Sequence, residues 1–372
     1  MTPTRRPEVG LFIDPPNDRF FGDRLFAEHP YGDYNAPYDY VKQLLGQQGI
    51  PVHTADLVLS GEGAAERNLY VSIGQRARYR RLARRPDVVL SALVVHECPI
   101  ADPALFSDLF DASLAFRRIY SFSGADALAP FVRGPVDVRP LRYPYPVSEV
   151  DQMAWERKGR AFLAMINANK IPPLKTSELY TERLRAVEHF SRHEEIDLFG
   201  FGWGGPPYRI GGSRLPRPLQ RIRYQAERVL LQVGGERDPL LASARRAYRG
   251  SAISKSETLS RYTFSICFEN MVLEGWVTEK IFDCLRVGTV PVYLGAPDID
   301  SWVWPECFVD MRRFSGYDEL REFLHTLSPA EIDAYRAAGR EYFSSKQFYP
   351  FTKQAFSAIF EEIVREDAEV TS

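Results

Sequence analysis

The chain has 372 residues, of which 45% are hydrophobic and 13% aromatic, and its formal net charge is −2. The length predicts two or three domains with substantial cores, and the near-neutral charge argues against nucleic acid as the main partner. No run approaches 18 consecutive apolar residues and the N-terminus has no signal-like apolar stretch, so we expect no transmembrane segment. The favoured location is cytoplasmic, with peripheral contact at the inner membrane surface as an open alternative.

The first half of the chain has the pattern of an α/β unit. Apolar runs predict buried strands at 8–13 and 87–95, with a helix over 38–48 between them. The proline-rich passage 135–146 is expected to lack regular structure and to act as the linker. Four widely spaced cysteines show no CxxC pairing and are predicted to be reduced core residues: Cys98, Cys267, Cys284 and Cys307.

The second half opens a second α/β unit. Its apolar pattern predicts, in order, a strand, a helix and a strand over 161–166, 182–191 and 196–201. Residues 202–250 then carry ten arginines against three acids. We expect the arginine-rich segment 205–250 to be a solvated, poorly ordered insertion, with an acidic or lipid-linked acceptor as the alternative role. Closing helices are predicted over 331–343 and 351–366, the last with an apolar stripe at helical spacing: Phe356, Ile359, Phe360, Ile363 and Val364.

The most informative stretch is 262–295, where two β-rich runs, 262–268 and 289–295, flank one compact helix. Thr278 is a suitable N-cap and Gly288 a suitable C-terminal stop. The apolar stripe of this helix consists of Ile281, Phe282 and Leu285.

Glu279 and Lys280 therefore lie in the first helical turn, beyond the carboxyl end of a strand, where open α/β sheets bind ligands. The free N–H groups and positive dipole of such a turn attract anions, and Lys280 adds a full charge. Glu279 would repel a phosphate and should instead accept hydrogen bonds from sugar hydroxyls. The pattern predicts a site for a nucleoside diphosphate that carries a sugar. The alternative is a buried strand–helix–strand unit with a surface ion pair.

A second group of polar residues, His96-Glu97-Cys98-Pro99, directly follows the strand that ends at Val95. A carboxylate in this place can serve as a general base, which contributes roughly 10²–10⁴-fold in rate. Glu97 is our candidate, and His96 competes with it because of its intrinsic pKa. The structural alternatives are a strand-end carboxylate that caps a turn and a hydrogen-bonded structural histidine.

These residues also carry a family resemblance. The sequences at 268–270 (FEN), 278–280 (TEK), 288–292 (GTVPV) and Gly295 resemble the donor-binding signature of the α-1,3/1,4-fucosyltransferases, glycosyltransferase family 10. Residues 97–99 and 108–117 resemble that family's E-S-P and N-L-F-N-W-T-L-S-Y-R segment, whose glutamate is the proposed base of an inverting displacement. The resemblance covers about 88–118 and 160–345 and is weak over the first 85 residues.

The resemblance implies an α/β fold of GT-B type, with two Rossmann-like domains and a cleft between them. Residues 1–150 would form the acceptor-binding domain and residues 151–345 the GDP-sugar donor-binding domain. Residues 346–372 would form a C-terminal helix that crosses back to the N-terminal domain. Animal and plant members are membrane-anchored in the Golgi, whereas a chain without such an anchor resembles the soluble bacterial members.

The resemblance also implies donor-site residues. Asn167 matches the asparagine of the family's S-N-P-N turn, and would order the loop or bond a phosphate. Trp276 holds the aromatic position before V-T-E-K, and would pack on the ribose or guanine, or else lie in the core. Asn270 and Glu279 would hold the sugar and ribose hydroxyls.

The chain departs from the family at one basic position. Family members carry an arginine near the start of the helix that precedes the I-D-x-x-G strand, and Tyr180 stands there instead. Arg183 lies one turn later on the same face and is assigned the phosphate role. Arg185 and Lys175 are fallback candidates, and a solvated arginine is the structural alternative.

The predicted function is inverting transfer of fucose from GDP-fucose to an oligosaccharide or lipid-linked glycan, with an α-1,3-type linkage. No Asp-x-Asp motif stands at a strand end, so no metal is implied as an obligatory cofactor, although a divalent ion could stimulate product release. Two alternatives stay open. One is a GT-B transferase that uses a different GDP-hexose, and the other is a non-catalytic glycan-binding protein on the same scaffold.

Overall fold

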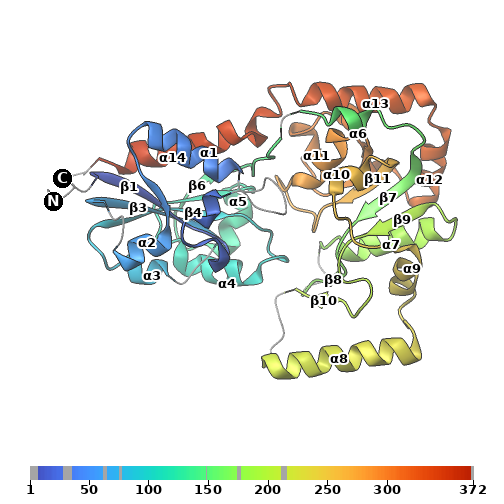
Figure 1. Ribbon diagram of the computed structural model, residues 1–372, viewed down its shortest axis with the longest axis horizontal. Helices are drawn as coiled ribbons and strands as arrows, with labels where there is room; N and C mark the ends of the chain where they lie inside the picture. Colours follow the sequence, from blue (N-terminus) through green and yellow to red (C-terminus); the bar gives the residue numbers. More distant parts are fainter. Residues whose placement is uncertain are drawn as a thin grey trace. The chain divides into compact units, whose positions relative to one another are not determined.

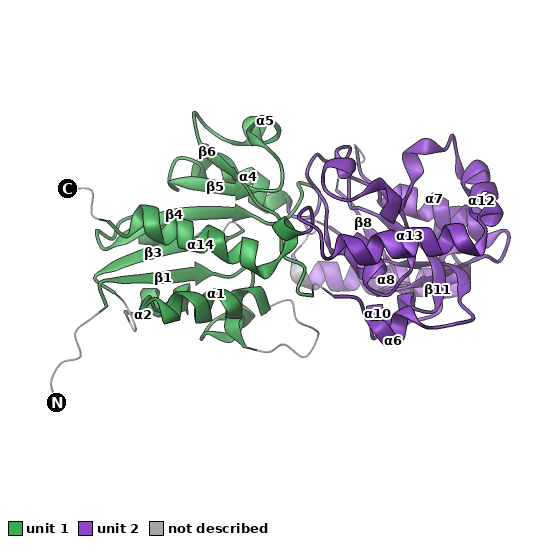
Figure 2. Ribbon diagram, turned by 90° about the horizontal axis from the view of Figure 1, so that it is seen from above, with its two compact units in different colours: residues 1–99, 103–148, 349–372 green, residues 100–102, 149–348 purple. Residues whose placement is uncertain are grey.

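The computed structural model describes residues 7–27, 36–61, 65–74, 78–147, 149–173, 177–210 and 216–369. These residues fall into two compact units (Figure 2). Unit 1 lies within 1–99, 103–148 and 349–372, and unit 2 lies within 100–102 and 149–348. The predicted domain ranges 1–150, 151–345 and 346–372 remain predictions of functional domains.

Unit 1 is built on a parallel six-stranded sheet with the order β2-β1-β3-β4-β5-β6. The strands are β1 (Val9–Asp14), β2 (Val52–Thr54), β3 (Arg67–Ile73), β4 (Val88–Val95), β5 (Arg118–Ser121) and β6 (Asp137–Pro140). The helices are α1 (Ala36–Gln47), α2 (Ala55–Ser60), α3 (Tyr79–Leu82), α4 (Pro103–Ala112), α5 (Ala125–Leu128) and α14 (Lys353–Asp367). Strands β1 and β4 and helix α1 agree with the sequence predictions within two residues.

The linker prediction for 135–146 was wrong in part, because residues 137–140 form the edge strand β6 beside β5. A proline is tolerated there, since Pro140 ends an edge strand that has no further neighbour to bond.

Helix α14 packs against α1 in unit 1 (Figure 1). Of the predicted apolar stripe, Phe356, Phe360, Ile363 and Val364 are buried, and Ile359 is partly buried. The ring of Phe356 meets that of Tyr38 edge to face, with centroids 5.3 Å apart. The last turn of α14 is held by a buried carboxylate. Arg118 donates to both oxygens of Asp367 at 2.9 Å, and Arg117 adds a contact at 2.6 Å.

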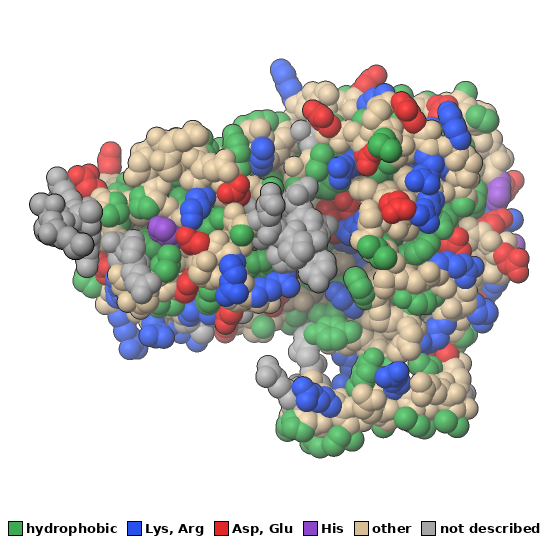
Figure 3. Space-filling view, viewed as in Figure 1, with side chains coloured by type: hydrophobic (Ala, Val, Ile, Leu, Met, Phe, Trp, Pro, Cys, Tyr) green, Lys and Arg blue, Asp and Glu red, His purple; other side chains and the backbone are tan. Residues whose placement is uncertain are grey.

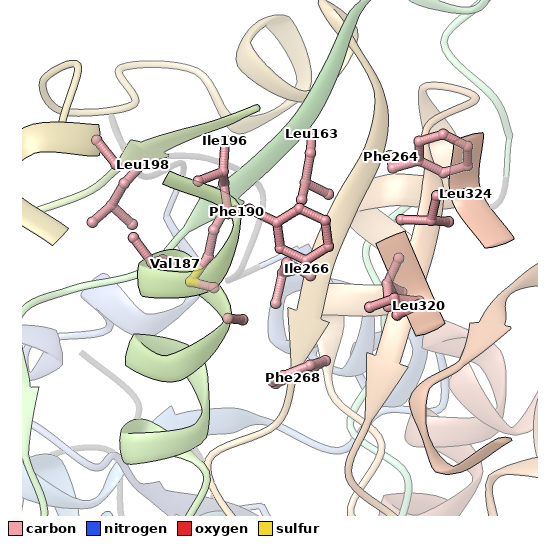
Figure 4. Close-up of a cluster of buried hydrophobic side chains, with 14 of the residues drawn as sticks. Leu163, Val187, Phe190, Ile196, Leu198, Phe264, Ile266, Phe268, Leu320 and Leu324 are labelled. Atoms are coloured by element: carbon pink, nitrogen blue, oxygen red, sulfur yellow. The ribbon is translucent and has the colours of Figure 1, made fainter. Parts of the chain in front are cut away.

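Unit 2 is built on a parallel five-stranded sheet with the order β13-β12-β11-β7-β9. Its strands are β7 (Ala161–Ile166), β9 (Ile196–Phe199), β11 (Tyr262–Phe268), β12 (Val290–Leu294) and β13 (Val309–Asp310). Its helices include α6 (Gln152–Trp155), α7 (Tyr180–Ser191), α9 (Pro239–Ala247), α10 (Lys255–Leu259), α11 (Glu279–Arg286), α12 (Tyr317–Thr326) and α13 (Pro329–Tyr342). Figure 4 shows the core on one face of this sheet, where Phe190 of α7 lies over Leu163 and Ile266.

The strand order of unit 2 contains one topological switch point. The chain passes from β7 to β9 on one side and then adds β11, β12 and β13 on the other. The crevice outside the carboxyl ends of β7 and β11 is therefore where an open α/β sheet binds its ligand.

The expectation of a poorly ordered 205–250 segment was wrong for the described residues. An 18-residue helix, α8 (Arg217–Gly234), lies apart from the main sheet of unit 2, beside the small ribbon of β8 (Lys170–Ile171) and β10 (Tyr208–Arg209) (Figure 1). The high arginine content does not oppose a helix, since arginine is a good helix former.

Among the described residues, no helix has the length and apolar character needed to cross a membrane. All four cysteines are buried free thiols, as predicted.

Asp367→Asn should lower the free energy of unfolding by about 3 kcal/mol, because it breaks a buried pair with Arg118. Burial alone would raise the pKa of Asp367, but hydrogen bonds from Arg118, Ser91 and Arg117 outweigh it and lower the pKa. The contribution is therefore present above about pH 4 and lost as the pH falls through the lowered pKa. Chemical denaturation at pH 7 and at lower pH measures it.

Glu366→Gln is the matched control, because Glu366 also pairs with Arg118, and with Arg139, but is itself exposed whereas Asp367 is fully buried. It should cost less than about 1 kcal/mol. Equal losses for the two variants would contradict the role given to Asp367.

Candidate functional site

The carboxyl edge of the unit 2 sheet brings together residues that are far apart in the sequence. Arg183 of α7 is buried, with 3% exposure. Its Nη1 donates to Asn167 Oδ1 at 3.0 Å and its Nη2 donates to Asn270 Oδ1 at 3.1 Å. Its Nε and Nη2 also donate to the carbonyl of Phe268 at the end of β11. Three predicted site residues thus form one cluster at the switch point between β7 and β11.

The cluster also includes Tyr180, which stands where the resembled family carries an arginine. Tyr180 is buried, and the guanidinium carbon of Arg183 lies 4.8 Å from the centroid of the Tyr180 ring. Aromatic rings stabilise cations in this geometry. The fallback Arg185 is exposed and pairs with Glu182 at 2.9 Å, and Lys175 lies outside the described residues. The oxygens of Asn167, Phe268 and Asn270 that accept from Arg183 are neutral.

The most buried charge of the edge is Glu269, which the sequence analysis treated only as part of a motif. Its carboxylate is fully buried. It accepts hydrogen bonds from the Thr278 backbone N–H at 2.9 Å, the Thr278 hydroxyl at 2.8 Å and Lys280 Nζ at 3.0 Å. Thr278 is the N-cap residue of α11, as predicted, but its side chain makes no capping bond; its hydroxyl donates to Glu269 and accepts from Lys280 Nζ at 2.8 Å.

Gly295 supplies the room for this carboxylate. A Cβ atom at position 295 would lie 2.5 Å from Glu269 Cγ and 2.6 Å from the Tyr293 hydroxyl. Both distances are shorter than real side-chain contacts, so any larger residue would displace Glu269. This arrangement has a signal in the sequence. A charged residue directly follows one apolar strand, and a glycine directly follows the next.

The first turn of α11 carries two opposite charges that are both stabilised. Burial would lower the pKa of Lys280, but Glu269 and Glu279 outweigh it and raise that pKa. Burial would raise the pKa of Glu279, but Lys280 and Lys255 outweigh it and lower the pKa to about 2. Lys255 Nζ lies 3.5 Å from Glu279 Oε1 and was not among the predicted residues. Both Glu279 and Lys280 are therefore charged at neutral pH, and the side chain of each is partly exposed.

Trp276 differs from the other predicted residues because it is buried, with 3% exposure. Its carbonyl accepts a long hydrogen bond from the Tyr293 hydroxyl at 3.5 Å. This position favours the core role that was the alternative to a ribose or guanine contact.

In unit 1, Glu97 and His96 directly follow β4 at the carboxyl edge of the sheet. The His96 ring packs against Gly74, which follows the neighbouring strand β3. Burial raises the pKa of Tyr143 to about 12. A hydrogen bond with Tyr38 opposes this rise, and the charge of Glu97 adds to it. The Tyr38 and Tyr143 hydroxyls are 2.6 Å apart. Glu97 thus lies at a strand end, as predicted, near a pair of tyrosines that the sequence analysis missed.

Comparison with known proteins gives a family match in the second half of the chain. Residues 241–364 match the profile described as "Glycosyltransferase family 10 (fucosyltransferase) C-term". Alpha-(1,3)-fucosyltransferase FucT from Helicobacter pylori is 37% identical over 119 residues, which are 31% of this chain and 24% of that protein. Alpha-(1,4)-fucosyltransferase from Arabidopsis thaliana is 34% identical over 86 residues, 22% of this chain and 21% of that protein.

A third relative, GDP-fucose protein O-fucosyltransferase 3 from Xenopus tropicalis, is 39% identical over 70 residues, 18% of this chain and 15% of that protein. The aligned segments therefore span a quarter or less of each relative's length.

Solved structures resemble the whole chain in fold. An alpha1,3-fucosyltransferase crystallised with GDP has a TM-score of 0.50 and 14% identity, over 99% of this chain and 93% of that chain. An alpha-glucosyltransferase in complex with UDP and DNA has a TM-score of 0.52 and 12% identity, over 96% of this chain and 99% of that chain. Together with two parallel α/β units, these likenesses confirm the predicted α/β fold of GT-B type. The cleft between the domains stays a prediction.

Gly295→Ala should lower the free energy of unfolding by about 1–3 kcal/mol, because its Cβ would displace the buried Glu269 or the Tyr293 hydroxyl. Thermal or chemical denaturation measures the loss. Gly204→Ala is the control, since a Cβ there meets no atom within 4 Å, and it should be nearly neutral. A stable Gly295→Ala protein would show that Glu269 is not confined as described.

Proposed function

We propose that this chain, whose residues 241–364 match the family model of glycosyltransferase family 10, transfers fucose from GDP-fucose to a hydroxyl group of an oligosaccharide or glycoconjugate. The observation that carries the proposal is the cluster of Asn167, Arg183 and Asn270 at the switch point of unit 2. The names of the three relatives share fucose transfer and differ in the linkage or acceptor that they state, so they support the donor more strongly than the α-1,3-type linkage.

The donor diphosphate is assigned to the positive charges of this edge. Lys280 and the N–H groups that open α11 face the leaving diphosphate, and Arg183 adds a buried positive charge. Donors fixed in place before the reaction stabilise developing negative charge at little reorganisation cost. Glu279 and Asn270 hold the sugar and ribose hydroxyls. Trp276 acts from within the core, and supports the start of α11 in place of stacking on the base.

The chemical step assigns the base to Glu97. Its carboxylate takes the proton of the acceptor hydroxyl while that oxygen attacks the anomeric carbon of fucose from the face opposite GDP. The bond between the anomeric carbon and the diphosphate oxygen breaks, and GDP leaves with the electron pair. The configuration inverts. In this proposal the reaction needs no obligatory metal ion. The enzyme is of the soluble bacterial type and works in the cytoplasm or at the inner membrane surface.

Two rival functions give different results in one experiment. A GT-B transferase for another GDP-hexose would turn over that sugar nucleotide and leave GDP-fucose unused. A non-catalytic glycan-binding protein would turn over none. A hydrolysis and transfer screen with GDP-fucose, GDP-mannose and UDP-sugars therefore tests the proposal directly, and a lipid-linked acceptor can be included among the acceptors.

Lys280→Ala should weaken GDP and GDP-fucose binding together, because the lost charge would contact the diphosphate that they share. A charge-assisted contact contributes about 1.5–3 kcal/mol, or roughly ten- to a hundredfold in affinity, which calorimetry can measure. The variant also removes the counter-charge of Glu269, so its folding must be verified.

Arg185→Ala is the matched control, since Arg185 is exposed and paired with Glu182, and its GDP affinity should not change. Unchanged GDP affinity in folded Lys280→Ala protein would refute the phosphate assignment.

Glu97→Gln should lower kcat by about 10²-fold or more, because glutamine keeps the shape of the side chain but cannot take the proton. GDP affinity and thermal stability should stay near wild type. His96→Asn is the control, because a histidine base would transfer the large kcat loss to that variant. If Glu97 only caps a turn, stability would drop and kcat would change little.

A further inference from the structure

The arginine-rich segment forms a helix with an exposed apolar stripe. In α8, Leu219, Ile222, Ala226, Val229 and Val233 follow each other at alternating spacings of three and four residues, which places them on one side of a helix. Ile222 is 64% exposed and Val233 is 85% exposed. Figure 3 shows hydrophobic side chains along the outer edge of this helix. Large apolar side chains gathered in this way mark an interaction surface.

A different side of α8 rests on the rest of unit 2. The residues that are partly buried are Gln220, Arg223, Glu227 and Leu231. Glu227 lies 3.5 Å from Arg209 of β10, and a Cβ at Gly205 would lie 2.7 Å from the Tyr224 hydroxyl. The apolar stripe is therefore not the face by which the helix is attached to its own unit.

The charges of α8 indicate what kind of partner its apolar stripe binds. The helix carries four arginines, Arg217, Arg221, Arg223 and Arg228, against one acid, Glu227. That acid faces two of the arginines of this region, Arg209 and Arg223. A helix with an apolar stripe, a strongly basic remainder and low overall hydrophobicity is the type that lies in the plane of an anionic membrane surface.

Two other occupants fit less well. A second copy would bring two helices with the same excess of arginines together, and like charges oppose that pairing. The alternating stripe also extends over only about two heptads, whereas coiled coils sustain it over at least three or four. A membrane-spanning role is excluded by the charges along the helix.

We propose that α8 docks the protein on an anionic lipid surface, with the stripe inserted at the level of the headgroups and the arginines near the lipid phosphates. This inference does not depend on the donor sugar or on the acceptor. It supplies a physical reason for an ordered basic helix in a place where a solvated insertion was expected.

Vesicle flotation of the full chain tests the proposal, with phosphatidylcholine vesicles that contain or lack phosphatidylglycerol. The wild-type protein should float with the anionic vesicles and be released by salt. An Ile222→Ser/Val229→Ser double variant should bind at least about tenfold more weakly. Arg221→Gln and Arg228→Gln should each weaken binding by up to about fivefold.

Ile253→Ser is the matched control, since Ile253 is a fully exposed apolar residue of unit 2 outside α8, and it should float like wild type. Unchanged circular dichroism and GDP affinity in the double variant exclude misfolding as the cause. The proposal is overturned if wild type does not float with anionic vesicles, or if the double variant floats equally well. A wild-type dimer in sedimentation velocity that the double variant loses, without vesicle binding, would assign the stripe to a second copy.

Discussion

The buried carboxylate of Glu269 is the constraint on which the donor edge depends. It lies at the end of β11, the central strand of the unit 2 sheet, where it is fully removed from water. Leaving such a charge unpaired costs several kcal/mol. The chain meets this requirement with the backbone and hydroxyl of Thr278 and the ammonium of Lys280. The start of α11 is therefore fixed to β11 by electrostatics, and the motif residues at 268–270, 278–280 and 295 act as one unit.

Two guanidinium groups, the buried Arg183 and the partly buried Arg160, hold the elements around this carboxylate in place. Arg183 links α7 to the ends of β7 and β11. At the other end of α11, Arg160 donates to the carbonyls of Val287 and Gly288, which places a cation where the helix dipole favours one. Burial lowers the pKa of Arg160 to about 10, with smaller contributions from Arg336 and Arg157. Helix α11 is thus held at its start by the buried Glu269 and near its end by the partly buried Arg160, and this rigidity suits a preorganised anion site.

The local sequence pattern was sufficient to predict the strands and helices that bury one face. The strands β7 and β11, the stripe of α11 and the stripe of α14 could be predicted, because burial on one face imposes a period on the sequence. Strand β6 was missed because prolines are typical of loops and are tolerated at a sheet edge. Helix α8 was missed because its arginine content was given more weight than the spacing of its apolar residues.

The contacts of the site are less accessible to sequence reasoning because they join distant segments. Tyr38 and Tyr143 are 105 residues apart, and nothing in either segment indicates their hydrogen bond. The close approach at Gly200 is another example, since a Cβ there would lie 2.1 Å from the Asn167 carbonyl oxygen. The glycine is visible in the sequence, but the neighbour that requires it is not. Arg183 could be chosen because helical spacing put it on the same face as Tyr180, a local relation.

The charges of the donor edge also determine where a pH dependence can originate. The lowered pKa of Glu279 means that its stabilising contribution is present above about pH 4 and is lost only as the pH falls toward 2. The raised pKa of Lys280 means that its contribution is present below about pH 10 and is lost only at a higher pH. Between these limits neither Glu279 nor Lys280 changes its charge. A change in catalysis near neutral pH would therefore originate in groups other than Glu279 and Lys280.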